Sequence, residues 1–208
     1  RQNPGLQSTF QFIDTAGEES EPSRHFYQNL AEAEYVVALY QYMRLLGYPA
    51  DRIAILTTYN GQRALIRDVL DRRCSWLPSL GFPRSVATVD QYQGQQSDYV
   101  LLSLVRTRKV GHVRDLRRLT VALSRARLGL YVFGCRRVFE SCFELQAAMS
   151  GLLVNGDRLA ICPQERFADD VGSEQQLPQR DVRVVEGLED MGQLVYEMIE
   201  AHVDTVAK

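Results

Sequence analysis

The sequence has no apolar run approaching the roughly 20 residues that span a membrane, and no signal-peptide pattern at its start. Its four cysteines and three histidines show no paired Cys-x-x-Cys or His-x-x-x-His spacing, which argues against a zinc site and predicts reduced, mostly buried thiols. These absences predict a soluble protein in an intracellular setting, with no membrane partner and no metal ligands of its own. The chain also lacks an initiator Met, so we interpret it as a piece of a longer protein.

The chain also lacks a net positive charge, because its 24 Lys and Arg are outnumbered by 26 Asp and Glu, which gives a net charge of −2. Positive charge is nevertheless concentrated in one segment. Between Arg106 and Arg127, eight Lys and Arg accompany one acidic residue, Asp115, so this segment carries +7 and the rest of the chain −9. Such a segment fits either a solvated basic helix face or a surface that meets an anion.

The sequence does contain enough apolar residues for a folded domain, with 45% hydrophobic composition over 208 residues. Short apolar runs alternate with segments of helical periodicity. We expect strands at 10–14, 52–59, 85–92, 98–107, 129–134 and 158–162, and helices at 30–46, 60–74, from about 116 toward the strand at 129, 136–149 and 187–203. Strands apolar on both faces are typical of parallel sheets covered by helices, so the pattern predicts an α/β fold with helices on both faces of a parallel sheet.

The character of the chain changes after Pro163, where FADDVGSEQQLPQRD is polar, acidic and contains proline. This composition predicts a linker or surface arm, so we divide the chain into a domain of residues 1–165 and an acidic linker with a C-terminal helix over residues 166–208. The last helix fits docking on a partner or packing back on the same domain, and amphipathic helices favour the second. Its apolar positions are Leu188, Met191, Leu194, Val195 and Met198.

Ligands of open parallel sheets bind beyond the carboxyl ends of the strands, and the residues that leave three predicted strands are polar. These exits are the segments 57–63, 90–96 and 106–109, and the start of the arginine-bearing helix is a fourth polar exit. Gly94, in QYQGQQSDY, fits a tight turn, but its flanking amides also fit close approach of the backbone to a ligand.

The arginine-bearing helix presents two of its arginines away from its apolar side. At about 100° per residue, Arg118 and Arg125 fall within about 20° of each other, opposite the leucines. A structural ion pair explains Arg118 equally well. Arg125 stands beside the small residues Ser124 and Ala126, which favours contact with a phosphate.

Three stretches in order, ILTTYNGQR, TVDQYQGQQSDYVLLSLVRT and DLRRLTVALSRARLGLYVFG, resemble motifs IV, V and VI of superfamily 1 helicases of the nonsense-mediated-decay helicase type. The resemblance covers residues 8 to 165 and is closest to the intron-binding, spliceosomal branch of the family. It implies the second RecA-like domain, of P-loop NTPase type, in a nuclear, ATP-dependent RNA helicase of pre-mRNA splicing. The implied partners are single-stranded intron RNA, a first RecA-like domain of the same protein and spliceosomal proteins.

The resemblance also implies roles for individual residues. Tyr59 would stack on the adenine, Arg63 would reach the phosphates, and Arg125 would be the arginine finger on the γ-phosphate. The residues implied at the nucleotide are Tyr59, Gln62, Arg63, Gly94, Gln96 and Arg125, and those implied along the RNA track are Thr57, Thr88, Asp90 and Arg106.

Two departures limit what this chain is expected to do. Gln96 stands where the family commonly has glutamate, which predicts slower or differently tuned hydrolysis. No Gly-x-x-x-x-Gly-Lys-Ser/Thr loop and no acidic magnesium motif occurs, so the first domain would hold the Mg²⁺ of ATP and this chain alone is expected to be inactive. A catalytically weak, helicase-derived scaffold for RNA or spliceosomal proteins remains open. A DNA helicase remains open too, because single-strand contacts are largely blind to sequence.

Overall fold

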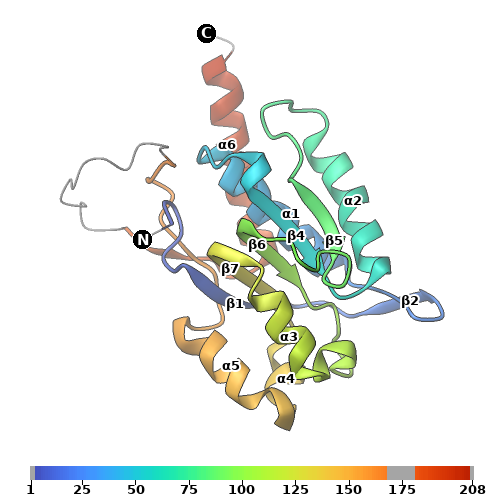
Figure 1. Cartoon of the computed structure of the whole chain (residues 1–208). Helices are drawn as coiled ribbons and strands as arrows, with labels where there is room; N and C mark the ends of the chain where they lie inside the picture. The colour runs from blue at the N-terminus through green and yellow to red at the C-terminus, as the bar shows by residue number, and fades with distance from the viewer. Residues whose placement is uncertain (1–2, 168–180, 207–208) are drawn as a thin grey trace.

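The computed structural model describes residues 3–167 and 181–206, and its centre is a five-stranded parallel sheet (Figure 1). The strand order is β1-β7-β6-β4-β5, and every neighbouring pair is parallel. The strands are β1 (Phe10–Asp14), β4 (Ile53–Thr57), β5 (Ser85–Thr88), β6 (Ser97–Ser103) and β7 (Ala126–Gly134). The predicted α/β class with a parallel sheet is confirmed.

Helices cover both faces of this sheet (Figure 1). One face carries α1 (Leu30–Leu45), α2 (Asn60–Cys74) and α6 (Leu188–Val206), and the other carries α3 (Leu116–Leu123), α4 (Arg136–Glu140) and α5 (Gln146–Leu152). Alternate residues of β4 divide between the two cores: Ile53 and Ile55 pack with α1 and α2, whereas Ala54 and Leu56 pack with α3 to α5. Burial on both faces explains why β4 reads as a continuous apolar run.

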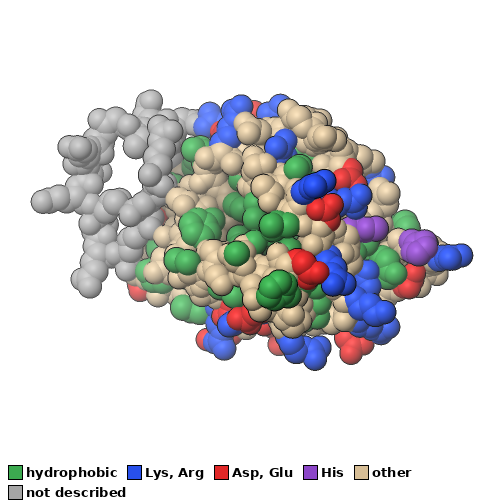
Figure 2. Space-filling view, turned by 60° about the horizontal axis from the view of Figure 1, so that its bottom comes forward, with side chains coloured by type: hydrophobic (Ala, Val, Ile, Leu, Met, Phe, Trp, Pro, Cys, Tyr) green, Lys and Arg blue, Asp and Glu red, His purple; other side chains and the backbone are tan. Residues whose placement is uncertain are grey.

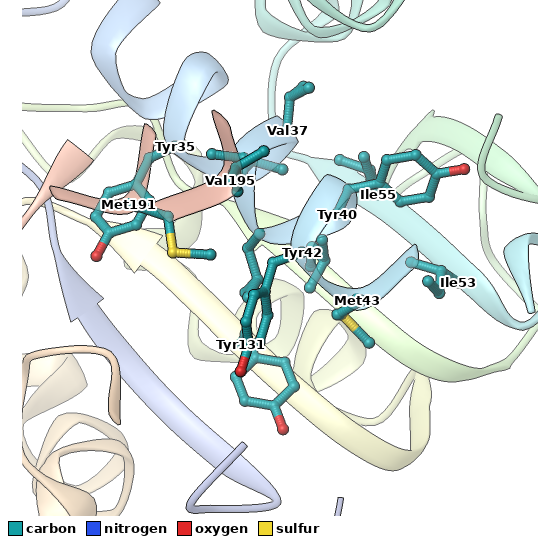
Figure 3. Packing of buried hydrophobic residues seen from close by; sticks show 14 of the residues in the cluster. Tyr35, Val37, Tyr40, Tyr42, Met43, Ile53, Ile55, Tyr131, Met191 and Val195 are labelled. Carbon is teal, nitrogen blue, oxygen red and sulfur yellow. The ribbon is translucent and has the colours of Figure 1, made fainter. Parts of the chain in front are cut away.

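The central helix α1 is fixed at both ends by signals in the sequence. Asn29 caps its start by accepting a hydrogen bond from the backbone N–H of Glu32 (3.1 Å), and Gly47, with φ of 102°, follows its end. Between these ends its tyrosines fill the core against β4, β7 and α6 (Figure 3). The hydroxyl of buried Tyr42 donates to the carbonyl oxygen of Gly5 at 2.8 Å.

The C-terminal helix α6 packs against α1, which confirms the expectation that it folds back on the same domain. Met191, Leu194 and Val195 are buried in the core cluster that α1 and α2 share, as is Ile199. The linker expected before it falls mostly on residues 168–180, which lie outside the described residues. Of the helices within 3–167 and 181–206, none is long and apolar enough to cross a membrane.

Three expectations about the second half of the chain are wrong. The arginine-bearing helix α3 ends at Leu123, because Ser124 and Arg125 already leave it toward β7. The helix expected at 136–149 is broken into α4 and α5. The strand expected at 158–162 is the two-residue β8 (Ala160–Ile161), which pairs antiparallel with β9 (Arg183–Val184) and does not join the main sheet.

A hairpin that the sequence did not predict lies between β1 and α1. It consists of β2 (Ser20–Ser23) and β3 (Phe26–Gln28) and projects from the body at the right of Figure 1. All four residues of β2 are exposed, so no apolar alternation marks the strand in the sequence.

Candidate nucleotide and single-strand half-sites

The predicted site residues lie in two groups, at opposite ends of the sheet. Ser97 pairs with Ala126 at the amino ends of β6 and β7, whereas Thr57 pairs with Thr88 and Ser103 at the carboxyl ends of β4, β5 and β6. The seven residues of β6 separate these levels by about 20 Å at 3.3 Å per residue. The amino-end group comprises Gly94, Gln96 and Arg125, and the carboxyl-end group comprises Thr57, Tyr59, Gln62, Arg63, Thr88, Asp90 and Arg106.

Arg125 lies just beyond the end of α3, and its guanidinium contacts only uncharged acceptors. It donates to the carbonyl oxygens of Val121 (2.9 Å) and Gln95 (3.1 Å) and to the Ser124 hydroxyl (3.0 Å). No carboxylate among the described residues forms an ion pair with it. The side chain is half-buried. Its positive charge is therefore oriented by the protein without being neutralised, which suits an anionic ligand.

The turn that contains Gly94 and Gln96 is joined to Arg125 through backbone contacts. The Ser97 N–H donates to the Arg125 carbonyl oxygen at 3.0 Å, and the exposed Gln96 amide reaches the Ser124 carbonyl oxygen at 3.5 Å. Gly94 has φ of 78°, and a Cβ there would meet nothing within 4 Å. The positive φ alone is enough to explain a glycine at this turn. Close approach of the Gly94 backbone to a ligand therefore stays a prediction.

The other arginines of the basic segment do not share Arg125's place. Arg118 was expected to stack beside Arg125 on one helix face. The helix α3 ends at Leu123, so Arg118 lies on the helix and Arg125 lies beyond it. Arg118 is exposed and forms no ion pair within the described residues. Arg114 is paired with Glu144 at 2.8 Å, and Arg127 lies 3.9 Å from Asp98.

Arg63, on the first turn of α2, connects two strand exits at the carboxyl end. Its guanidinium donates to the side-chain oxygen of Gln91, which follows β5, while its buried Nε has no hydrogen-bond partner among the described residues. Thr57 is fully buried and its hydroxyl also lacks such a partner. Thr88 accepts from the Gln91 N–H at 3.3 Å, and Asp90 is exposed.

Tyr59 was expected to stack on adenine, but the residue is only 4% exposed. Tyr27 meets it edge-on at 5.2 Å between ring centroids, and the His112 imidazole lies over it at 5.1 Å. Its hydroxyl accepts hydrogen bonds from the Arg106 guanidinium (3.3 Å) and from the backbone N–H of His112 (3.2 Å). Gly111 closes the loop above, since a Cβ at that position would lie 2.0 Å from the hydroxyl. No ring face is left for a base in this conformation.

Gln62 is fully buried, and all its hydrogen-bonding groups are used inside the protein. Its side-chain oxygen accepts from the Asn29 N–H (2.7 Å), and its amide donates to the Asn29 carbonyl oxygen (3.0 Å) and the Ser103 hydroxyl (3.1 Å). These bonds fix the start of α2 to the start of α1 and the end of β6. The geometry therefore makes Gln62 a positioning residue.

Arg106 was expected along the RNA track, but it is 9% exposed and bound to Glu19. Its Nε lies 3.0 Å from a Glu19 carboxylate oxygen, and its guanidinium lies 4.0 Å from the centroid of the Tyr27 ring. Burial opposes charge on both groups. Hydrogen bonds from Arg106, Thr107 and Arg108 nevertheless lower the pKa of the Glu19 carboxyl, and bonds to Glu19 and Tyr59 raise the pKa of Arg106.

A fully buried glutamate on α1, Glu32, was missed by the sequence reading. It accepts from the Ser103 hydroxyl (2.6 Å), the Val105 N–H (2.7 Å) and the Thr15 hydroxyl (3.3 Å), and burial raises its pKa to about 7. Val105 has φ of 73°, a strained value for a β-branched residue. Glu32 thus holds the exit of β6. A glutamate among apolar neighbours in LAEAEYVV was the available signal.

This parallel α/β domain, with an arginine held at a turn between α3 and β7, matches a known class of protein. A family model described as "AAA domain" matches residues 1–137, and the chain belongs to this family and to the superfamily 1 helicases of the nonsense-mediated-decay type. The chain is 54% identical, over 200 residues, to "RNA helicase aquarius" of Mus musculus, a match that covers 94% of this chain and 13% of that protein.

Two further relatives extend the comparison. "Pre-mRNA-splicing factor cwf11" of Schizosaccharomyces pombe is 32% identical over 170 residues, which cover 79% of this chain and 13% of that protein. "Regulator of nonsense transcripts 1 homolog" of Arabidopsis thaliana is 35% identical over 149 residues, which cover 70% of this chain and 12% of that protein. The chain thus spans about an eighth of the length of each of these three relatives.

Proposed function

We propose that this chain supplies the second RecA-like domain of an ATP-dependent RNA helicase that acts in pre-mRNA splicing in the nucleus. The names of the mouse and fission-yeast relatives support the RNA and the splicing context. Intron RNA and spliceosomal proteins are the proposed partners. A first RecA-like domain of the same protein would complete the nucleotide site and hold the Mg²⁺ with its acidic residues.

The observation that carries this proposal is the uncompensated guanidinium of Arg125. Oriented by three neutral acceptors, it would meet the γ-phosphate of a nucleotide bound mainly by the first domain. In that position it would stabilise charge on the phosphoryl group during transfer more than it stabilises bound ATP. Gly94 and Gln96, on the turn that contacts Arg125, would line the same phosphates.

We infer a different ligand for the carboxyl-end group. It lies about 20 Å along the strands from Arg125, and the Tyr59 ring is covered, so a single nucleotide contacting both groups fits poorly. Asp90, which is exposed, and Arg63, which is half-buried, would instead line the track of the single strand. The buried residues of the group would support that surface from beneath: Thr57, Tyr59, Gln62, Thr88 and Arg106.

The proposal is tested by Arg125→Ala and Arg125→Lys in a protein that carries both RecA-like domains. Fingers of this kind contribute on the order of 10³ to 10⁵ in rate, so Arg125→Ala should suppress steady-state ATPase by orders of magnitude. Lysine should rescue little, because an ammonium lacks the planar fork of guanidinium. The exposed Arg118→Ala is the matched control. Near-normal turnover of both Arg125 variants at unchanged thermal stability would remove Arg125 from the site.

A second candidate function is a helicase-derived scaffold that binds RNA or spliceosomal proteins with little turnover. Gln96 favours it, because a neutral amide stands where the family commonly has a carboxylate. The same ATPase assay separates the two, since a scaffold would show little turnover before any substitution.

A further inference from the structure

The β2–β3 hairpin is fastened rigidly to the carboxyl-end group. Gln28 donates from its amide to the Gly61 carbonyl oxygen at 3.1 Å, next to the start of α2. A Cβ on Gly61 would lie 2.6 Å from the Tyr27 carbonyl oxygen, so only glycine allows the hairpin to lie this close. The Tyr27 ring is held between the Tyr59 ring and the Arg106 guanidinium. The hairpin therefore has a packed base and a fixed direction.

Glu19, the residue before β2, anchors the other side of the base. One of its carboxylate oxygens accepts hydrogen bonds from the Arg106 guanidinium (3.0 Å) and from the N–H groups of Thr107 (2.5 Å) and Arg108 (3.2 Å). Its own N–H donates to the Thr107 hydroxyl at 3.0 Å. The Glu19 and Arg106 side chains are 5% and 10% exposed, so the pair is largely shielded from water and salt.

The tip of the hairpin exposes Arg24 and His25 next to the Glu21 carboxylate. Arg24 forms no ion pair with any described residue. His25 has φ of 63°, and its N–H donates to the Glu21 carboxylate at 2.7 Å, which fixes the turn. Figure 2 shows Lys and Arg side chains gathered beside the histidines at the end of the molecule where the hairpin projects in Figure 1.

The base of the hairpin and the loop after β6 meet at Tyr59. The Tyr27 ring of the hairpin meets the Tyr59 ring edge-on at 5.2 Å between centroids, and the His112 imidazole of the loop lies 5.1 Å from the same ring. The backbone N–H of His112 also donates to the Tyr59 hydroxyl at 3.2 Å. The hairpin and the basic segment, more than 80 residues apart in the sequence, are therefore neighbours in the fold.

We propose that the β2–β3 hairpin is an arm of the RNA track, which binds single-stranded RNA through Arg24 and His25 beyond the carboxyl-end group. This inference rests on the proposed function. Arg24 would neutralise a phosphate and His25 would contact a phosphate or stack on a base, neither of which requires a particular sequence. Arg106 and Glu19 act as positioning residues, because they fix the arm without touching RNA.

The contact at the tip is tested by Arg24→Ala combined with His25→Ala in the protein that carries both RecA-like domains, titrated with fluorescent oligouridylates. Both side chains are exposed, so folding should be unaffected. A long oligonucleotide should bind at least about fivefold more weakly, and the slope of log affinity against log salt should become shallower by about 1. An oligonucleotide too short to reach the arm should bind as it does to the unchanged protein.

The positioning role is tested by Glu19→Gln. For this variant, a purely electrostatic effect and a positioning effect predict opposite changes in RNA affinity. Removing a negative charge near RNA should strengthen binding if charge alone matters. Loosening the arm should weaken binding of the long oligonucleotide instead, and this is the result we expect. Glu18→Gln, an exposed neighbour with the same charge change, is the matched control and should bind as the unchanged protein does or slightly more tightly.

The outcomes separate this inference from the function on which it rests. If the unchanged protein fails to bind oligouridylate, the proposed function fails, whatever the hairpin does. If it binds but the Arg24/His25 double variant keeps both its affinity and its salt slope, the arm is not part of the track. If the hairpin contacts a partner protein instead of RNA, the double variant would likewise keep its RNA affinity and salt slope, and the proposal would be overturned.

Discussion

The arginines of this protein differ in whether a carboxylate of the protein forms an ion pair with them. Arg106 is buried against Glu19, and the exposed Arg114 is paired with Glu144 at the surface, so both already have a carboxylate partner within the protein. Arg125 is held only by neutral oxygens. The sequence singled out Arg125 as a phosphate contact because Ser124 and Ala126 beside it are small, and that role stays a prediction. The sequence could not reveal the role of Arg106, because the partner Glu19 lies 87 positions away in the chain.

Gln96 provides a direct test of the phosphate end. Its exposed amide makes only a 3.5 Å contact to the Ser124 carbonyl oxygen, so a carboxylate would disturb little there. Gln96→Glu in the protein with both RecA-like domains should preserve or raise RNA-stimulated ATP turnover, because it restores the residue common in the family. The exposed neighbour Gln95→Glu is the control for added charge. A collapse of turnover in Gln96→Glu alone would mean that Gln96 belongs to a different local network.

Elements with strong local signals were predicted well, and those decided by distant contacts were not. β1 and α2 begin and end where expected, since turn residues and Asn60-Gly61 flank clear periodicities. The end of α3 could not be read, because the helical pattern continues through Arg125. In the fold, the Ser97 N–H donates a hydrogen bond to the Arg125 carbonyl oxygen, so the chain at Arg125 already pairs with β6 and leads into β7. β8 finds its partner more than 20 residues later, beyond any local pattern.

The packing of α6 predicts that this helix is needed for stability. Met191 is fully buried against α1, so Met191→Ala should lower the free energy of unfolding by about 2 to 5 kcal/mol. Tyr196→Ala, on the exposed side of the same helix, should change it by less than about 1 kcal/mol. Urea unfolding of the two variants gives the comparison. Equal, small effects would mean that α6 is not part of the cooperative core.

The contact between α1 and the exit of β6 should depend on pH through Glu32. Its pKa is raised to about 7 in the folded protein, so its contribution to stability is fully present below the unfolded value of 4.5 and is lost as pH rises through 7. Glu32→Gln keeps an acceptor for Val105 and cannot ionise. Relative to the unchanged protein, it should therefore gain up to about 3 kcal/mol between pH 5 and pH 8.

Urea unfolding at the two pH values measures this gain. A difference between Glu32→Gln and the unchanged protein that is the same at pH 5 and pH 8 would mean that Glu32 titrates normally.

At the scale of the whole molecule, the predicted site residues lie in two groups at opposite ends of one sheet. One group is at the turn that contains Arg125. The other is the carboxyl-end group, which lies against the base of the β2–β3 hairpin. The sequence predicted the sheet, the helices on both faces and the family. The resemblance assigned three residues of the carboxyl-end group, Tyr59, Gln62 and Arg63, to the same nucleotide as Arg125. No single motif reveals the strand register that separates these residues from Arg125.

A split site predicts how ATP turnover should depend on the first RecA-like domain. The most direct measurement is steady-state ATPase of this chain alone and of the protein that joins it to that domain, each with and without single-stranded RNA. We predict no turnover by this chain alone, turnover by the joined protein, and stimulation by RNA that weakens as salt is raised. Turnover by this chain alone, or a joined protein that binds RNA without hydrolysing ATP, would contradict the account.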